Sequence, residues 1–312
     1  QARREASERV LANEYPGCLD ALTYAHVPAR VLWDEHLTPE KLRGVRTLVL
    51  PSAACLSDEQ IAAVRRFVEA GGGLIATFET GMYDEWGDEA QRQDWLQFLG
   101  VASVEGALVP SRIEDYMTVV SDALPGWRRG LLLPLPLNAL KVRPAADAAV
   151  AIRYNVPLGK SYMNPQGVSD HPAAIICRRG KGRVIYLASP LFESFNLYRI
   201  DAHKDLIRDL ARLAAGRSGL QVETNAPGSL AVEVRSQKRR TIVHLVNATG
   251  DMKRPICAVV PLRDVEVTLR SAPVRRARAL RRNRPLKCTS SRGRASFVLP
   301  RVDDYEVVVL EH

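Results

Sequence analysis

Polar and acidic side chains stand at the ends of several apolar, strand-like segments in the first two thirds of the sequence. Two carboxyl groups held at a suitable separation can hydrolyse a glycoside, one as the acid and the other as the nucleophile or base. Glu79 and Asp84 share one segment end, and Glu193 follows another. With their polar neighbours they form a candidate crevice, which comprises Ser52, Cys55, Glu79, Thr80, Asn155, Glu193 and Asn196.

The same residue types also have structural interpretations. Glu79 can accept backbone N–H groups, and Asp84 and Asp88 suit a turn before the helix-like segment 89–100. A cysteine nucleophile needs a sharp, glycine-flanked turn between strand and helix, with a histidine in reach. Cys55 lies in SAACLSDEQ, which lacks that turn, so we expect it to be a small buried packing residue. For the crevice we favour structural or interface roles over contact with a sugar or small ligand, and either over catalysis.

Two aromatic residues occupy the polar loop that ends GGGLIATFETGMYDEWG, residues 71–87. Large aromatic side chains in such a loop either pack onto their own domain or contact a partner. We expect Tyr83 and Trp86 to lie at an interface.

Cysteine and histidine spacing gives no sign of a cofactor. The cysteines are an odd number, five, with no C-x-x-C pair, and the six histidines show no H-E-x-x-H motif. The glycine clusters match neither phosphate-binding motif. We therefore expect no metal, no cofactor and a reducing, cytoplasmic location. No apolar run approaches the roughly 20 residues of a membrane-spanning helix, so we expect no membrane contact.

The formal charge of +9 is concentrated in the last third of the sequence. Residues 1–219 hold 26 Lys and Arg against 26 Asp and Glu, whereas residues 220–312 hold 18 against 9. A basic module that binds anionic glycan or nucleic acid is one interpretation. No aromatic residue interrupts the arginines of PVRRARALRRNRPLKC to stack on bases, so we favour a solvated strand face and do not expect nucleic acid as a partner.

Helix-like and strand-like segments alternate as far as residue 216. Continuous apolar strands separated by helices are typical of a parallel sheet with helices on both faces. We expect helices at 57–70, capped by Ser57, and at 199–216, a short helix from Thr38, and strands at 29–33, 47–50, 74–78, 148–156 and within 173–190, the last containing a hairpin turn at 180–182. From residue 220 the pattern changes to short alternating strands, which predict a small antiparallel β-sandwich. The expected domains are 1–219 and 220–312.

The stretch LTPEKLRGVRTLVLPSAACLSDEQIAAVRRFVEAGGGLIATFETGMYDEWG resembles the middle domain of family 42 β-galactosidases and related glycosidase-like proteins. That domain is a flavodoxin-like module, akin to class I glutamine amidotransferases, and is named for its part in trimerisation. LPSAACLSDEQ, GGGLIATFETG and GKGRVIYLASP carry the resemblance most specifically, over roughly residues 16–216. The part from residue 220 is similar in position to the C-terminal β-sandwich of those enzymes.

The resemblance implies a region without catalytic residues of its own. In the family, a preceding (β/α)₈ barrel carries both catalytic carboxylates, and such a barrel needs about 250 residues. We therefore expect either the C-terminal part of a larger glycosidase-like protein or a free-standing relative, assembled as a homo-oligomer, with a trimer favoured. A stand-alone hydrolase that uses the crevice acids is the alternative, and a carbohydrate is the expected ligand class.

Overall fold

The computed structural model describes residues 10–108, 115–136, 138–158, 160, 163–250 and 258–312. The chain divides into two compact units, which are described separately below. The first contains the described residues up to Leu19 together with Val31–Gly219, and the second contains Asp20–Arg30 and Leu220–His312. None of the described helices combines the length and the apolar character needed to cross a membrane.

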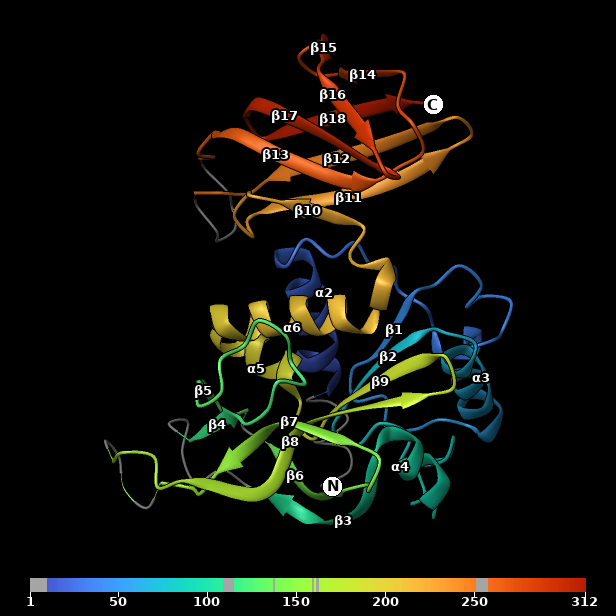
Figure 1. The fold of residues 1–312 in the computed structure, drawn as a ribbon, viewed down its shortest axis with the longest axis vertical. Helices are drawn as coiled ribbons and strands as arrows, with labels where there is room; N and C mark the ends of the chain where they lie inside the picture. Colours follow the sequence, from blue (N-terminus) through green and yellow to red (C-terminus); the bar gives the residue numbers. More distant parts are fainter. Residues whose placement is uncertain (1–9, 109–114, 137, 159, 161–162, 251–257) are drawn as a thin grey trace. The chain divides into compact units, whose positions relative to one another are not determined.

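A mixed seven-stranded sheet forms the centre of the first unit (Figure 1). In spatial order its strands are β1 (Thr47–Leu50), β2 (Gly73–Thr77), β9 (Gly182–Leu187), β8 (Val168–Arg179), β7 (Ala149–Asn155), β4 (Tyr116–Val119) and β5 (Leu132–Pro134). β1, β2 and β9 are parallel, and the pairs from β9 to β5 are antiparallel. The predicted α/β fold is confirmed, and the predicted hairpin at 180–182 is where the sheet changes from parallel to antiparallel pairing, because so short a turn can join only antiparallel strands.

Helices cover both faces of this sheet. The described helices are the π-helix η1 (Val10–Glu14), α2 (Tyr15–Tyr24), the 3₁₀ helix η2 (Asp34–His36), α3 (Asp58–Glu69), α4 (Gln93–Leu99), α5 (Leu191–Tyr198), α6 (Asp201–Ala214) and the 3₁₀ helix η3 (Gly216–Ser218). Figure 1 shows α6 on one side of β2 and β9 and α4 on the other. Beside the sheet, β3 (Val101–Leu108) and β6 (Ala139–Pro144) form an antiparallel pair.

Two glycines allow helices to approach the parallel strands closely. A Cβ atom at Gly182 would lie 2.1 Å from the carbonyl oxygen of Val68 in α3. A Cβ atom at Gly73 would lie 2.3 Å from the carbonyl oxygen of Ala214 in α6. Both contacts are with backbone, so a larger residue would force the helix away from its strand.

Two of the predicted elements were wrong. Residues 29–33 form no strand, because this segment runs along the surface without a paired neighbour and leaves Trp33 65% exposed. The segment after Thr38 forms hydrogen-bonded turns in place of a helix, with the Leu42 amide donating to the Thr38 carbonyl at 3.0 Å. Gly44, at a φ of 79°, ends these turns before a stable helix can propagate.

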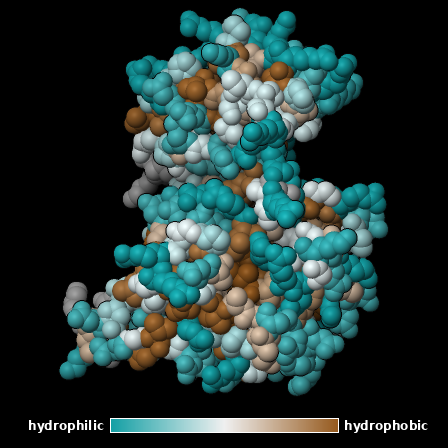
Figure 2. All heavy atoms as spheres, viewed as in Figure 1, coloured by the Kyte–Doolittle hydropathy of each residue, from teal (hydrophilic) through white to brown (hydrophobic). Residues whose placement is uncertain are grey.

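The second unit is a β-sandwich of two antiparallel sheets, as predicted. One sheet contains β10 (Val222–Thr224), β13 (Leu262–Arg270), β17 (Arg294–Val302) and β16 (Cys288–Ser291). The other contains β11 (Leu230–Gln237), β12 (Arg240–Asn247), β18 (Tyr305–Glu311), β14 (Arg276–Ala279) and β15 (Arg284–Leu286). Alternate residues of the long strands, such as Val308 and Leu310, point into a shared apolar core. Figure 2 shows hydrophilic residues over most of this unit's visible surface.

Candidate functional site

The parallel strands bring several of the predicted crevice residues to one edge of the sheet. β1, β2 and β9 are parallel and end on the same edge. β7 also ends there, because it is antiparallel to β8, which is itself antiparallel to β9. Open α/β sheets bind ligands at this carboxyl edge. The residues placed after these strand ends are Ser52, Cys55, Glu79, Thr80, Glu193 and Asn196, and Asn155 is the last residue of β7.

A buried carboxyl group, that of Glu14, connects three chain segments at this edge through hydrogen bonds. Its side chain is 1% exposed, at the end of η1. The Thr77 hydroxyl donates to Glu14 Oε1 at 2.6 Å, and the Ser52 hydroxyl lies 3.4 Å from the same oxygen. The backbone amide of Glu193 donates to Oε2 at 2.5 Å. Glu14 therefore joins the ends of β1 and β2 to the first turn of α5.

Burial gives Glu14 an unusual acidity. Removal of the carboxyl group from water, opposed by hydrogen bonds from Thr77 and from the Glu193 amide, raises its pKa to about 7. The nearby charge of Glu193 acts in the same direction as burial. A carboxylic acid that titrates near neutrality has the acidity of a general acid. Both carboxyl groups are enclosed, however, with Glu193 4% exposed, and the contacts of Glu14 are with its own chain. These features describe a polar cluster within the core.

The remaining crevice residues are divided between this cluster and other contacts. Asn196 donates from Nδ2 to Oδ1 of Asn13 at 3.1 Å, next to Glu14 in sequence. The Thr80 hydroxyl, fully buried, lies 2.6 Å from the Thr77 carbonyl oxygen. Asn155 is buried and accepts a 2.6 Å bond from the Thr118 hydroxyl, which ties β7 to β4. Ser52, Thr80, Asn155 and Glu193 are all buried.

Cys55 is exposed, which corrects the expectation that it packs in the core. The buried neighbour is Leu56, at 1% exposure, because Cys55 forms a parallel β-bridge with Tyr83 at the surface. Partial desolvation, and then the charges of Asp84 and Glu79, raise the pKa of the Cys55 thiol. A raised pKa favours the protonated thiol over the nucleophilic thiolate, which is the opposite of what activates a cysteine.

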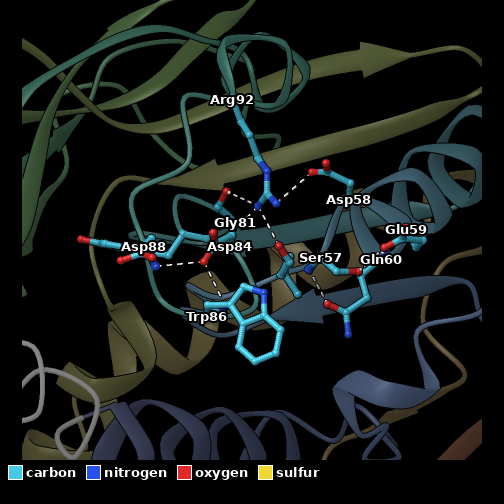
Figure 3. Close-up of polar contacts among 11 residues, drawn as sticks. Ser57, Asp58, Glu59, Gln60, Gly81, Asp84, Trp86, Asp88 and Arg92 are labelled. Carbon is cyan, nitrogen blue, oxygen red and sulfur yellow. Dashed lines mark hydrogen bonds and ion pairs between the residues drawn. The ribbon is translucent and has the colours of Figure 1, made fainter.

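The loop between β2 and α4 is folded around Asp84. Asp84 Oδ1 accepts hydrogen bonds from the amides of Trp86 and Asp88, both at 2.9 Å. Gly87 adopts a φ of 83° within this turn. The predicted turn role of Asp84 and Asp88 is thus confirmed (Figure 3).

Arg92 holds this loop against the segment that follows β1. Its Nη1 donates to the carbonyl oxygens of Leu56 at 2.7 Å and Tyr83 at 3.0 Å, and its Nη2 lies 2.9 Å from Asp58 Oδ1. Backbone bonds from Tyr83 to Ala54 and from Leu56 to Tyr83 add to the connection. One guanidinium group therefore fixes two loops to the N-terminus of α3 (Figure 3).

Trp86 projects from this fixed loop. Its side chain is 84% exposed, and in Figure 3 the indole ring points away from Arg92. The base of the loop rests on Trp95, whose Nε1 donates to the Thr80 carbonyl at 2.9 Å. Tyr83 is partly buried. The loop thus presents one large aromatic side chain on a well-supported backbone.

Glu14 and Arg92 are not recognisable as important from the sequence alone. Glu14 contacts an amide 179 residues away, and Arg92 contacts a carbonyl 36 residues away. Neither lies in a recognisable motif, so no local signal marks them.

Among the described residues, no group of three His, Cys, Asp or Glu side chains is arranged to hold a metal ion.

The sequence is related to those of curated β-galactosidases. It is 27% identical over 174 residues to β-galactosidase BbgII of Bifidobacterium bifidum, which covers 55% of this chain and 22% of that enzyme. It is 23% identical over 254 residues to β-galactosidase BglY of Alicyclobacillus acidocaldarius, which covers 79% of this chain and 32% of that enzyme. The chain spans less than a third of the length of either relative. No protein-family model matches the sequence.

Solved glycosidases contain the same fold. α-L-Fucosidase isoenzyme 2 from Paenibacillus thiaminolyticus matches with a TM-score of 0.75 and 19% identity, over 95% of this chain and 44% of the enzyme. Gan42B, a family 42 β-galactosidase from G. stearothermophilus, matches with a TM-score of 0.60 and 20% identity, over 95% of this chain and 35% of the enzyme. At these identities the matches show a shared fold. The predicted resemblance is therefore confirmed: in sequence and in fold, the chain is similar to a part of family 42 and related β-galactosidases.

Proposed function

We propose that the chain is a non-catalytic region of a glycoside hydrolase related to β-galactosidases, and that it serves assembly and shapes the surroundings of the active site. The observation that carries this proposal is Trp86, 84% exposed on a loop that Arg92 fixes in place. A rigid aromatic anchor loses little conformational entropy on association, so it contributes efficiently to an interface. A homotrimer is the assembly that we propose, with Trp86 at the subunit boundary.

The state of the acidic residues supports a non-catalytic role. Hydrolysis of a glycoside needs two carboxyl groups on either side of an accessible bond. Glu14 and Glu193 are enclosed, at 1% and 4% exposure, and Glu14 is bonded to Ser52, Thr77 and the Glu193 amide. Their hydrogen bonds support a structural role at the sheet edge.

The identities of the structural neighbours support an accessory role as well. The fold recurs in a protein named as an α-L-fucosidase and in others named as β-galactosidases. A region shared by enzymes that act on different sugars is better suited to a common architectural task than to recognition of one substrate. We propose that carbohydrate specificity lies in other parts of such proteins, and that carbohydrate contacts this region at most at its exposed loops.

A cytoplasmic location goes with this proposal. The four described cysteines, Cys18, Cys55, Cys177 and Cys288, are free thiols, which suits a reducing compartment.

Activity assays test whether the chain catalyses anything by itself. The purified 312-residue chain is incubated with an aryl β-galactoside and an aryl α-L-fucoside, and release of the phenol is followed. We expect no turnover above the buffer rate, because Glu14 and Glu193, the two carboxyl groups that the sheet edge brings together, are enclosed. Turnover that is abolished by Glu193→Gln or Glu79→Gln would contradict the proposal and favour the stand-alone hydrolase.

A further inference from the structure

An arginine-lined hollow of about 470 Å³ lies at one end of the five-stranded sheet of the second unit. Its lining residues are Arg239, Arg240, Arg275, Arg276, Glu311 and His312. Four arginines less one glutamate leave a formal side-chain charge of +3 when the histidine is neutral. None of these lining residues belongs to the carboxyl edge or to the Trp86 loop of the first unit.

Strand pairing brings these residues together. Glu311, at the end of β18, is directly opposite Arg240 at the start of β12 and Arg276 at the start of β14. Residues opposite one another across strands share a face of the sheet, so both arginines flank the glutamate. The ladder continues beyond the strand ends, with the Arg275 amide donating to the Glu311 carbonyl at 2.8 Å and the His312 amide to the Arg239 carbonyl at 2.9 Å. The register of β12, β18 and β14 therefore places Arg240 and Arg276 on either side of Glu311, and the continued backbone pairing brings Arg239 and Arg275 to the same end of the sheet.

The positive charge of the hollow is poorly neutralised. Arg240 Nη2 lies 3.5 Å from Glu311 Oε1, a surface ion pair of the kind that contributes little to stability. Arg239, Arg275 and Arg276 are exposed and form no ion pair with any carboxylate in the part of the chain that the structure describes. All three line the same hollow, so their like charges repel one another.

Elsewhere in the same unit, arginines close together do have acidic partners. Arg281 Nη1 lies 2.9 Å from Asp304 Oδ1, and Arg282 Nη2 lies 2.5 Å from Asp303 Oδ2. Part of the arginine excess therefore lies on a solvated, ion-paired surface, as predicted from the sequence. The hollow differs because its lining has a single acidic side chain, Glu311, among four arginines.

His312 is held in a fixed orientation at this hollow. Its Nδ1 lies 3.3 Å from the Pro273 carbonyl oxygen, which can only accept a hydrogen bond, so Nδ1 carries a hydrogen. Its Nε2 lies 2.8 Å from the Thr241 hydroxyl. These two contacts orient the imidazole ring where it lines the hollow beside the arginines.

We propose that this hollow binds a tetrahedral oxyanion, a phosphate or sulfate group carried by a small molecule. Guanidinium groups match the oxygens of such a group with paired, charge-assisted hydrogen bonds. The volume lies within the range of small-ligand sites. The lining contains no Trp, Tyr or Phe on which bases could stack, which separates this site from a single-stranded nucleic-acid surface.

Calorimetric titration of the full chain at low ionic strength tests the proposal. The probes are inorganic pyrophosphate, inorganic sulfate and a sulfated disaccharide, which separate the phosphate and sulfate sources. The site variant is Arg239→Ser with Arg276→Ser. The matched control is Arg263→Ser with Arg292→Asn, which removes the same charge from two exposed positions, one on β13 and one in the turn between β16 and β17.

We expect saturable one-to-one binding of at least one probe, weakened about tenfold or more in the site variant and less than about twofold in the control. Thermal melts of both variants establish that they remain folded. Absence of saturable binding for all probes would overturn the proposal, as would an equal loss in both variants. Tight retention on DNA without binding of any small probe would also overturn it, and would favour an extended surface that binds polyanions.

Discussion

The Thr77 hydroxyl donates a 2.6 Å hydrogen bond to Oε1 of Glu14, which lies 63 residues earlier in the chain. This bond joins the end of β2 to η1 inside the first unit. The Thr77 hydroxyl oxygen also accepts a 2.8 Å bond from the Ser52 amide, so it connects the ends of two adjacent strands to the carboxyl group. The geometry at the carboxyl edge of the sheet therefore depends on Glu14, an acid whose charge state changes near neutral pH.

Glu14→Gln is expected to remove a pH dependence of stability. Because the pKa of Glu14 rises from 4.5 to about 7 on folding, the folded state binds more protons than the unfolded state between these values. The resulting stabilisation is complete below pH 4.5 and is lost as the pH rises to about 7, a change of about 3 kcal/mol. Urea unfolding at pH 4.5, 6 and 8 measures it. The free energy of unfolding of Glu14→Gln should increase relative to that of the unaltered chain across this range. Parallel pH profiles for the two proteins would show that Glu14 is not the group responsible.

Arg92→Ala is expected to destabilise the first unit. The change removes donors to the carbonyls of Leu56 and Tyr83 and the ion pair with Asp58, and it leaves polar backbone groups without their partner. We expect a loss of about 2 kcal/mol in urea unfolding, together with faster amide exchange in residues 81–88. Arg66→Ala, an exposed position on α3, is the control and should change stability by less than about 0.5 kcal/mol. Equal effects of the two variants would show that Arg92 does not hold the loop.

Gly182→Ala is expected to be strongly destabilising. The new methyl group would lie 2.1 Å from the Val68 carbonyl oxygen and 2.3 Å from that of Gly72, and neither backbone group can move without disturbing α3 or the turn after it. We expect a loss of about 3 kcal/mol or more in chemical unfolding. Gly87→Ala meets nothing within 4 Å but adopts a φ of 83°, so its cost should be near 1 kcal/mol. A Gly182→Ala variant as stable as Gly87→Ala would contradict the close packing of α3 on β9.

The parts of the fold that local sequence decides were predictable. Ser57 caps α3 because the Gln60 amide and side chain bond reciprocally with it, and this pattern lies within four residues. The strand predicted at 29–33 failed because an apolar stretch becomes a strand only where a neighbour offers a ladder. Glu14 and Arg92 were missed since their partners are distant in sequence. Cys55 was misplaced because burial in the loop falls on the next residue, Leu56.

Trp86 is expected to contribute to association without contributing to the stability of the fold. At 84% exposure its removal leaves no cavity, so Trp86→Ala should change the free energy of unfolding by less than about 0.5 kcal/mol. An aromatic anchor at the centre of an interface contributes about 2 kcal/mol or more per contact, which corresponds to roughly thirtyfold in affinity. Trp33→Ala is the matched control, because Trp33 is also exposed, at 65%, and lies outside the Trp86 loop.

Multi-angle light scattering over a concentration series tests the proposed assembly most directly. The measurement compares the unaltered chain with Trp86→Ala and Trp33→Ala. We expect a trimer for the unaltered chain and for Trp33→Ala, and a shift of the Trp86→Ala variant toward monomer at concentrations where the others remain associated. A strictly monomeric chain, or a trimer that Trp86→Ala leaves intact, would contradict the assignment of this loop to the subunit interface.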